Sequence, residues 1–190
     1  MLVVRSGAPV LRHVLAALVL AGTILVPAPS PADPRAQFPP EAEVHGQALP
    51  LRGTGRLVWM KLVKVYDAAG ADALKDAPKR LEIRYHVSIK GEKFGESAEP
   101  FLKKNVPAEV LAVIRQRIEQ LNRLYQDVKE GDRYALDYAP GKGTTLSLNG
   151  SPLGTIEGAD FASAYFAIWL GSKPISDTMR DELTGTNTRK

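Results

Sequence analysis

The chain has no cysteine, and histidine and tryptophan are scarce, with three and two copies in 190 residues. Without cysteine, neither a disulfide framework nor a thiolate metal site is possible. Only His45 and His86 lie outside the leader described below, so a histidine-based metal site would have at most two imidazoles. We therefore expect no metal and no other cofactor.

Several common functional motifs are also missing. There is no G-x-S-x-G elbow, and Gly141–Thr145 lacks the spacing of a phosphate-binding P-loop, so a hairpin turn explains it better. The formal charge of +4 falls to +2 without residues 1–32, and there is neither a basic stripe nor an aromatic RNA-binding strand. These absences argue against a nucleic-acid partner.

The N-terminus has the pattern of a secretory leader. Arg5 and Arg12 precede an apolar run over 14–26, which is about half the length that a membrane-spanning helix needs. Small residues at Ser30 and Ala32 predict a signal peptide over 1–32 with cleavage before Asp33, and Ala36 is a second candidate start. An uncleaved anchor is the alternative. After cleavage no membrane span remains, so we expect a bacterial periplasmic or secreted protein, for which the lack of cysteine is no obstacle.

The rest of the sequence predicts an α+β domain over 43–185, after an unstructured, proline-rich lead-in over 33–42 and before a tail at 186–190. Alternating apolar residues and turn signals, including Gly53–Gly55 and Asn149–Gly150, predict an antiparallel sheet. The strands are expected over 43–51, 57–68, 80–90, 133–138, 144–148 and 152–156. Helical spacing predicts helices over 92–104, 107–125, 158–170 and 176–183.

Three sequence segments together resemble the bacterial, exported branch of the chalcone isomerase-like family, over about residues 43–185. They are GTGR at 53–56, KVYDAA at 64–69 and GDRYALDYAPGKGTTLSLNGSPLGTIEGADFASAYFAIWLG at 131–171. The resemblance implies an open-faced β-sandwich, in which a large antiparallel sheet has a layer of helices on one side and a cleft between sheet and helices.

The resemblance also implies which residues would meet a ligand. The plant isomerases use an arginine and a threonine, which fall near Arg56 and Tyr66 here, and a tyrosine, a lysine and an asparagine on a helix. Those three fall on Phe94, Ser97 and Phe101, so the plant catalytic set is lost. The fatty-acid-binding branch instead uses an arginine and a tyrosine to hold a carboxylate, and Arg56 and Tyr66 have those types. The alternative is that Arg56 is a solvated turn residue and Tyr66 belongs to the core.

Three functions follow from these observations. The first is a non-catalytic binder of a small lipophilic acid or fatty acid. The second is an intramolecular lyase that closes chalcones, in which Tyr85, His86 or Lys90 would replace the lost donors beside Arg56. The third is an envelope assembly protein that docks through the 115–123 face of a helix. Aromatic residues could line an apolar cavity, and the candidates are Trp59, Phe94, Phe101, Phe161, Tyr165 and Trp169.

Overall fold

A computed structural model describes residues 39–57, 61–67 and 74–186, and at 56–57 and 61–67 it describes the backbone only. The predicted signal peptide, Trp59 and the last four residues lie outside this part. The strands are β1 (Glu41–Val44), β2 (Gln47–Leu57), β3 (Lys61–Asp67), β4 (Lys79–Tyr85), β5 (Arg133–Ala139), β6 (Gly143–Leu148) and β7 (Ser151–Ile156). The helices are α1 (Glu92–Asn105), α2 (Ala108–Leu124), α3 (Ala159–Leu170) and α4 (Asp177–Thr184).

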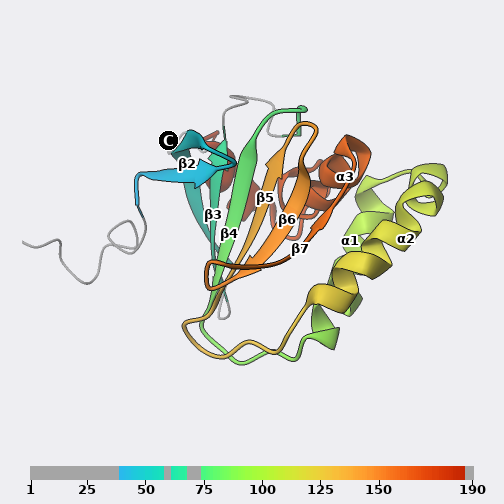
Figure 1. Cartoon of the computed structure of the whole chain (residues 1–190), viewed down its shortest axis with the longest axis horizontal. Helices are drawn as coiled ribbons and strands as arrows, with labels where there is room; N and C mark the ends of the chain where they lie inside the picture. Colours follow the sequence, from blue (N-terminus) through green and yellow to red (C-terminus); the bar gives the residue numbers. More distant parts are fainter. Residues whose placement is uncertain (1–38, 58–60, 68–73, 187–190) are drawn as a thin grey trace, which may run out of the picture.

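The strands form one antiparallel sheet in which each pairs with its neighbour in sequence, in the order β1 to β7 (Figure 1). Short hairpins make most of the connections. Asn149 and Gly150 both have positive φ, at 52° and 83°, as the predicted two-residue turn requires. The two helices α1 and α2 are inserted between β4 and β5. The α+β class and the antiparallel sheet that the sequence predicted are therefore confirmed.

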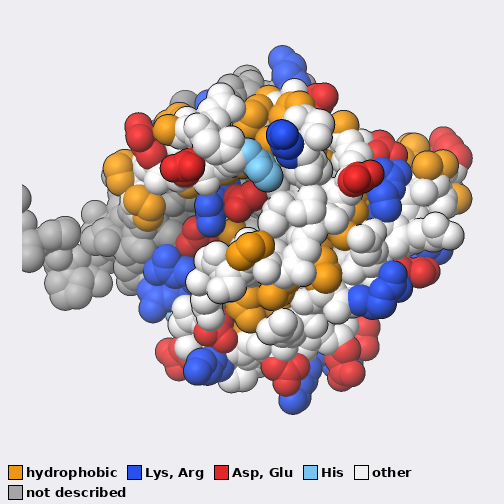
Figure 2. All heavy atoms as spheres, in the orientation of Figure 1, with side chains coloured by type: hydrophobic (Ala, Val, Ile, Leu, Met, Phe, Trp, Pro, Cys, Tyr) orange, Lys and Arg blue, Asp and Glu red, His pale blue; other side chains and the backbone are white. Residues whose placement is uncertain are grey.

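The helices cover one face of the sheet. Alternate residues of β4, such as Leu81 and Ile83, are buried beneath them, and α3 is buried along most of its length. The helices α1 and α2 lie along the β7 side of the sheet, and acidic and basic side chains are interspersed over them (Figures 1 and 2). The result is an open sheet with a single helical layer, and the main apolar core lies between the two.

The predicted helices form close to their expected bounds. Pro100 lies within α1, and the helical run is nevertheless continuous from Glu92 to Asn105. The last helix begins where the sequence predicts it, since Ser176 Oγ accepts a bond from the Met179 amide at 3.3 Å, and Gly185 ends the helix in the left-handed region. No helix within the described residues is long and apolar enough to cross a membrane.

The turn predicted at Gly53–Gly55 is wrong. The chain reverses on either side of these glycines, at His45–Gly46 and between Leu57 and Lys61, and both glycines lie inside β2 beside a register shift. A Cβ on Gly53 would collide with the backbone carbonyls of Glu182 and Leu183. Glycine is needed there because α4 packs directly on the strand, and not because the chain reverses.

The strand predicted over 80–90 ends at Tyr85. Beyond it the chain faces the turn at Lys129–Asp132, where Gly131 has a φ of +91°, and only the pair Ile89 and Val128 resumes the ladder. Val87, which continues the alternation of Leu81, Ile83 and Tyr85 in the sequence, is 37% exposed. The tight turn of the partner segment therefore stops a pairing that the alternation in the sequence alone would extend.

The sheet face that points away from the helices bears a compact charged cluster of Arg80, Glu82, Arg133 and Asp137. Arg80 Nε lies 3.6 Å from Glu82 and 3.4 Å from Asp137, and Arg133 lies 3.3 Å from Glu82. The β1–β2 hairpin lies next to this cluster, and Arg80 donates a hydrogen bond to the carbonyl of Glu43 in β1 at 3.4 Å. Burial raises the pKa of Asp137 to about 6, although Arg80 opposes the shift.

Candidate ligand-binding cavity

The space between the sheet and the helices is lined by a cluster of aromatic rings. Tyr85 at the end of β4 and Tyr134 at the start of β5 contact each other edge to face at 6.0 Å. Phe94 of α1 contacts Tyr134 at 5.3 Å and stacks on Tyr125 at 4.8 Å. Tyr165 of α3 completes the wall. The cavity thus lies where the end of β4, the start of β5 and the end of α2 meet the helices α1 and α3.

The polar atoms of this cavity are mostly phenol hydroxyls. The hydroxyls of Tyr125 and Tyr165 lie 2.9 Å apart and share one hydrogen bond. Tyr134 donates to the carbonyl of Gln126 at 3.0 Å and accepts from its amide at 2.7 Å, so this hydroxyl is committed to the backbone. The Tyr125–Tyr165 pair therefore offers the hydroxyls most able to turn toward a ligand.

These phenols are neutral at physiological pH. Burial raises the pKa of Tyr165 to about 12, and it raises the pKa values of Tyr85 and Tyr125 well above the ordinary value of 10. A neutral phenol donates a hydrogen bond but does not act as a base near pH 7. The site is therefore suited to holding an oxygen atom of a ligand within an apolar lining.

The cavity is small, with a volume of about 30 Å³. That is room for about one water molecule, whereas pockets for small organic ligands measure roughly 300–1,000 Å³. The cavity as it stands is therefore too small for such a ligand. A ligand larger than water would have to move α1 or α3 away from the sheet.

The predicted site residues are placed differently from one another. Tyr85 is 1% exposed and lines the cavity, whereas His86 and Lys90 are exposed beyond the end of β4. Lys90 pairs with Asp127 at 2.6 Å and lines a separate surface hollow. The structure thus does not bring Tyr85, His86 and Lys90 together.

Arg56 and Tyr66 have described backbones, but their side chains lie outside the described part. Arg56 pairs with Leu62, and Tyr66 pairs with Leu51 and with Arg80. The alternation of the pleat therefore puts both backbone positions on the sheet face of Arg80, opposite the face that the helices cover. A carboxylate clasp by these two residues stays a prediction.

A buried cation that the sequence analysis missed lies on the helix-covered face. Lys79 is 2% exposed, its Nζ bonds to the carbonyl of Lys75, and it lies 5.3 Å from the ring of Tyr138 and 5.8 Å from that of Phe166. Lys79 lies just outside the strand predicted over 80–90, and only its position one residue before that alternating strand could have indicated burial. Tyr125 and Tyr134, predicted as a helix end and a strand residue, were missed as cavity residues in the same way.

The remaining predicted lining residues divide into two groups. Phe94, Tyr165 and Trp169 line the cavity, as does Ser97. Phe161 is fully buried and stacks on Tyr165 at 5.5 Å, and Phe101 lies outside the cavity wall.

The basic face predicted on α2 is smaller than expected because one of its arginines has an internal partner. Arg117 makes two bonds to Asp160, at 2.7 and 2.6 Å, and a third to the carbonyl of Glu157 at 3.1 Å. It thereby joins α2 to the start of α3, and of the three arginines on that face Arg115 and Arg123 stay exposed.

The family model for chalcone isomerase-like proteins matches residues 35–185. This chain belongs to the chalcone isomerase-like family. A crystal structure of a fatty-acid binding protein from Arabidopsis thaliana has a similar fold, with a TM-score of 0.62 over 78% of this chain and 91% of that one. The two sequences are 14% identical, so the likeness concerns the fold. No curated protein sequence matches this chalcone isomerase-like chain.

Proposed function

We propose that this chalcone isomerase-like protein binds a small lipophilic acid, such as a fatty acid, between its sheet and its helices without chemically changing it. The supporting observation is the aromatic cavity whose hydroxyls are neutral phenols. Such a lining favours an apolar body, and the Tyr125–Tyr165 pair supplies a donor to an oxygen atom. The fold it shares with a protein described as fatty-acid binding agrees with this proposal.

Binding requires the helical layer to open, because the closed cavity holds only about 30 Å³. Two polar links oppose this opening. One is the Arg117–Asp160 pair, and the other is Asn105, which donates to the carbonyl of Lys173 at 2.7 Å and accepts from its amide at 2.9 Å. Because a ligand must break these contacts to enter, their free energy reduces the observed affinity. A substitution that weakens either contact should therefore raise the affinity.

The carboxylate end of the ligand has two candidate partners. An arginine and a tyrosine, such as Arg56 and Tyr66, are suitable residues for holding a carboxylate. To hold it on the helix-covered side of the sheet, β2 and β3 would have to shift by one residue in register, because such a shift moves each residue to the other face. Lys79 already lies on the helix side and needs no shift. The variants Arg56→Gln and Lys79→Met separate these alternatives, since the one that holds the carboxylate should weaken the binding of laurate and leave dodecanol unaffected.

The decisive experiment is to express residues 33–190, purify them without detergent and analyse the protein by native mass spectrometry and organic extraction. A discrete bound acid would support the proposal. Titration of the empty protein with laurate can be followed by fluorescence, because Trp169 lines the cavity, and Trp169→Phe is the control. If neither a co-purified lipid nor any affinity for fatty acids or flavonoids is found, the binder proposal fails. Acceleration of naringenin chalcone closure that Arg56→Ala abolishes would instead favour an intramolecular lyase.

We also propose that residues 1–32 are a cleaved signal peptide and that the protein acts in a bacterial periplasm or outside the cell. The charged start, the short apolar run and the small residues before Asp33 support this. N-terminal sequencing of the protein recovered from its native envelope fraction should give a start at Asp33 or Ala36, and a start at Met1 would contradict it.

A further inference from the structure

The helices α1 and α2 are attached to the sheet by a narrow neck, formed by residues 86–91 and 126–132 (Figure 1). The chain leaves the sheet after β4 and returns to it at β5, and between these points Ile89 and Val128 exchange two backbone hydrogen bonds of 2.9 Å. The three neck residues that follow β4 are exposed, and Gly131 on the other segment has a φ of +91°. Exposed residues at the ends of elements are the positions that absorb backbone rotation in hinged motions, so the neck is suited to act as a hinge.

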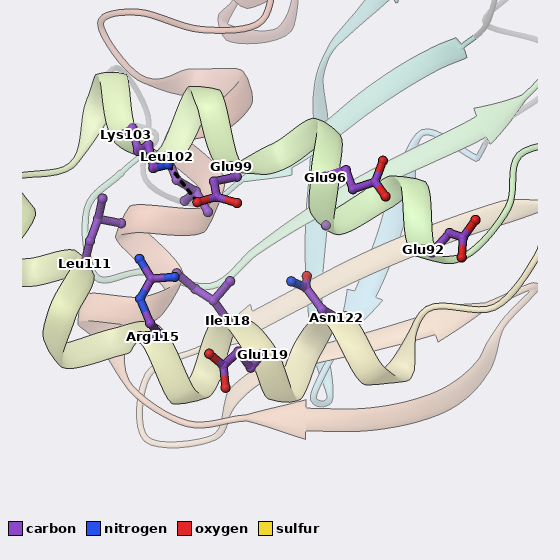
Figure 3. A pocket seen from close by; sticks show the side chains of 11 residues that line it. Glu92, Glu96, Glu99, Leu102, Lys103, Leu111, Arg115, Ile118, Glu119 and Asn122 are labelled. Carbon is purple, nitrogen blue, oxygen red and sulfur yellow. Dashed lines mark ion pairs between the residues drawn. The ribbon is translucent and has the colours of Figure 1, made fainter.

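The two helices are joined to each other at both ends. Far from the neck, only residues 106–107 separate the end of α1 from the start of α2. At the neck end, a Cβ on Gly95 would fall 2.7 Å from the side-chain amide of Asn122, so the helices touch there. Between these ends, Leu102 of α1 and Ile118 of α2 point into the groove that the two helices share (Figure 3). The helices α1 and α2 therefore form one unit, the helical arm.

The helix α3, by contrast, is held in place on all sides. Eight of its twelve residues are buried, and residues 157–158 are all that separates it from β7. After α3, the Ile175 amide donates to the carbonyl of Ile168 at 2.8 Å, and the chain continues into α4, which packs directly on Gly53 and Gly55 of β2. If the helical layer opens, the helical arm is therefore the part that moves, and α3 stays with the sheet.

The seam between α1 and α3 lies over the aromatic cavity. Ala98 on one side of the seam and Trp169 on the other both line the cavity. The end of the seam farthest from the neck is fastened by Asn105, which donates to the carbonyl of Lys173 at 2.7 Å and accepts from its amide at 2.9 Å. A Cβ on Gly171 would fall 2.5 Å from the side-chain oxygen of Asn105, so a glycine is needed there for the asparagine to reach its partner.

We infer that the helical arm is a hinged lid on the aromatic cavity, which turns on the neck, parts from α3 along this seam and is latched by Asn105. Arg117 forms a second latch through its two bonds to Asp160 at the start of α3. Near the hinge, the Tyr134 hydroxyl holds the backbone of Gln126, so that end of the arm stays in place while the Asn105 end moves most. Such a lid sets the rates at which a ligand enters and leaves. The inference rests on the proposed function for the ligand that enters, whereas the motion itself can be measured on the empty protein.

The motion can be measured by thiol labelling, because the chain has no cysteine of its own. Ala98→Cys puts a single thiol on the inner side of the lid, at a position that is 7% exposed. A chromogenic disulfide reagent should label it at least about tenfold faster than the global free energy of unfolding of the same variant allows. The rate should be nearly independent of urea below the unfolding transition, because lid opening exposes little surface. Adding Asn105→Ala should speed the labelling about tenfold, since two hydrogen bonds across the seam are lost.

The entry route can be tested by locking the lid. In Arg117→Cys/Asp160→Cys, a short bis-maleimide ties α2 to the start of α3. In the matched control, Glu99→Cys/Arg115→Cys, the same reagent ties α1 to α2 within the lid, across the groove of Figure 3. Each pair removes one arginine and one acid. Laurate uptake is followed by the fluorescence of Trp169, which lines the cavity. Linking should slow uptake at least about tenfold in the first variant, because the competent open state is lost, and should leave the control unchanged.

Four results would overturn the inference. The thiol is labelled no faster than global unfolding allows, Asn105→Ala leaves its labelling rate unchanged, or the linked Arg117→Cys/Asp160→Cys protein takes up laurate as fast as the unlinked one. The fourth is that the control link slows uptake equally, because α1 and α2 would then move apart instead of moving together. If no variant binds laurate, linked or unlinked, the binder proposal fails, and the labelling of the empty protein still decides whether the lid opens.

Discussion

The buried carboxyl group of Asp137 should make the free energy of unfolding fall as the pH rises. Its carboxylate lies under the β1–β2 hairpin with a side chain 15% exposed, and its Oδ1 has no hydrogen-bond partner among the described residues. Arg80 is close, at 3.4 Å, but not aligned for a hydrogen bond, so burial outweighs the attraction and raises the pKa from 3.8 to about 6.

The sign of the effect follows from this direction. Below about pH 4 the carboxyl is protonated in both the folded and the unfolded chain, and it does not affect the equilibrium. Between about pH 4 and 6 the folded chain binds the proton more tightly, so the free energy of unfolding falls by about 1.4 kcal/mol per pH unit as pH rises. Above pH 6 the full penalty of roughly 3 kcal/mol for ionised Asp137 persists.

The measurement is urea unfolding of the wild type and of Asp137→Asn at pH 7 and pH 5, followed by circular dichroism. Other carboxylates, such as Asp160, have lowered pKa values and affect stability with the opposite sign, so the difference between the two proteins isolates Asp137. Relative to the wild type, Asp137→Asn should be more stable by up to about 3 kcal/mol at pH 7, and by clearly less at pH 5. Equal differences at the two pH values would refute the reasoning.

Three further predictions have defined outcomes. Gly53→Ala should lower the free energy of unfolding by about 1–3 kcal/mol in thermal or urea melts, because the added Cβ meets backbone carbonyls of α4. Gly141→Ala is the control: the added Cβ has open space around it, and only the positive φ of this position opposes alanine. It should lower the free energy of unfolding by only about 1 kcal/mol. A double-mutant cycle of Arg117→Met and Asp160→Asn should give a coupling of about 1 kcal/mol, and a value near zero would mean that the two bonds do not hold α2 to α3. Tyr165→Phe should lower stability by about 1 kcal/mol because it removes the bond to Tyr125, and an unchanged melting curve would contradict that bond.

The sequence predicted the helices and the later strands well because their signals are local. These signals depend on residues that are close together in the sequence. Examples are the amphipathic stripe of α2, the Ser176 cap and the Asn149–Gly150 hairpin. Glycine at 53 and 55 was misread because its reason is tertiary: α4, more than 120 residues later, packs on β2. A glycine that accommodates another backbone has the same sequence signature as a glycine that makes a turn.

The candidate site was only partly predictable for a similar reason. Phe94, Tyr165 and Trp169 were expected in the cavity from their helical spacing. The sequence could not show that Tyr125 would reach Tyr165 across the helical layer, or that Lys79 would be buried. Both depend on how separate elements pack and not on any periodic pattern.

The contact between α4 and β2 has a consequence for the order of folding. Every strand pairs with its neighbour in sequence, so the meander can form one hairpin at a time as the chain emerges. The packing of Met179 and Leu183 against Gly55 must wait for the last residues of the domain to be synthesised. We therefore expect a chain truncated before Asp177 to form its hairpins but to leave Gly53 and Gly55 of β2 without the cover of α4. That exposed strand surface would be open to association with other chains.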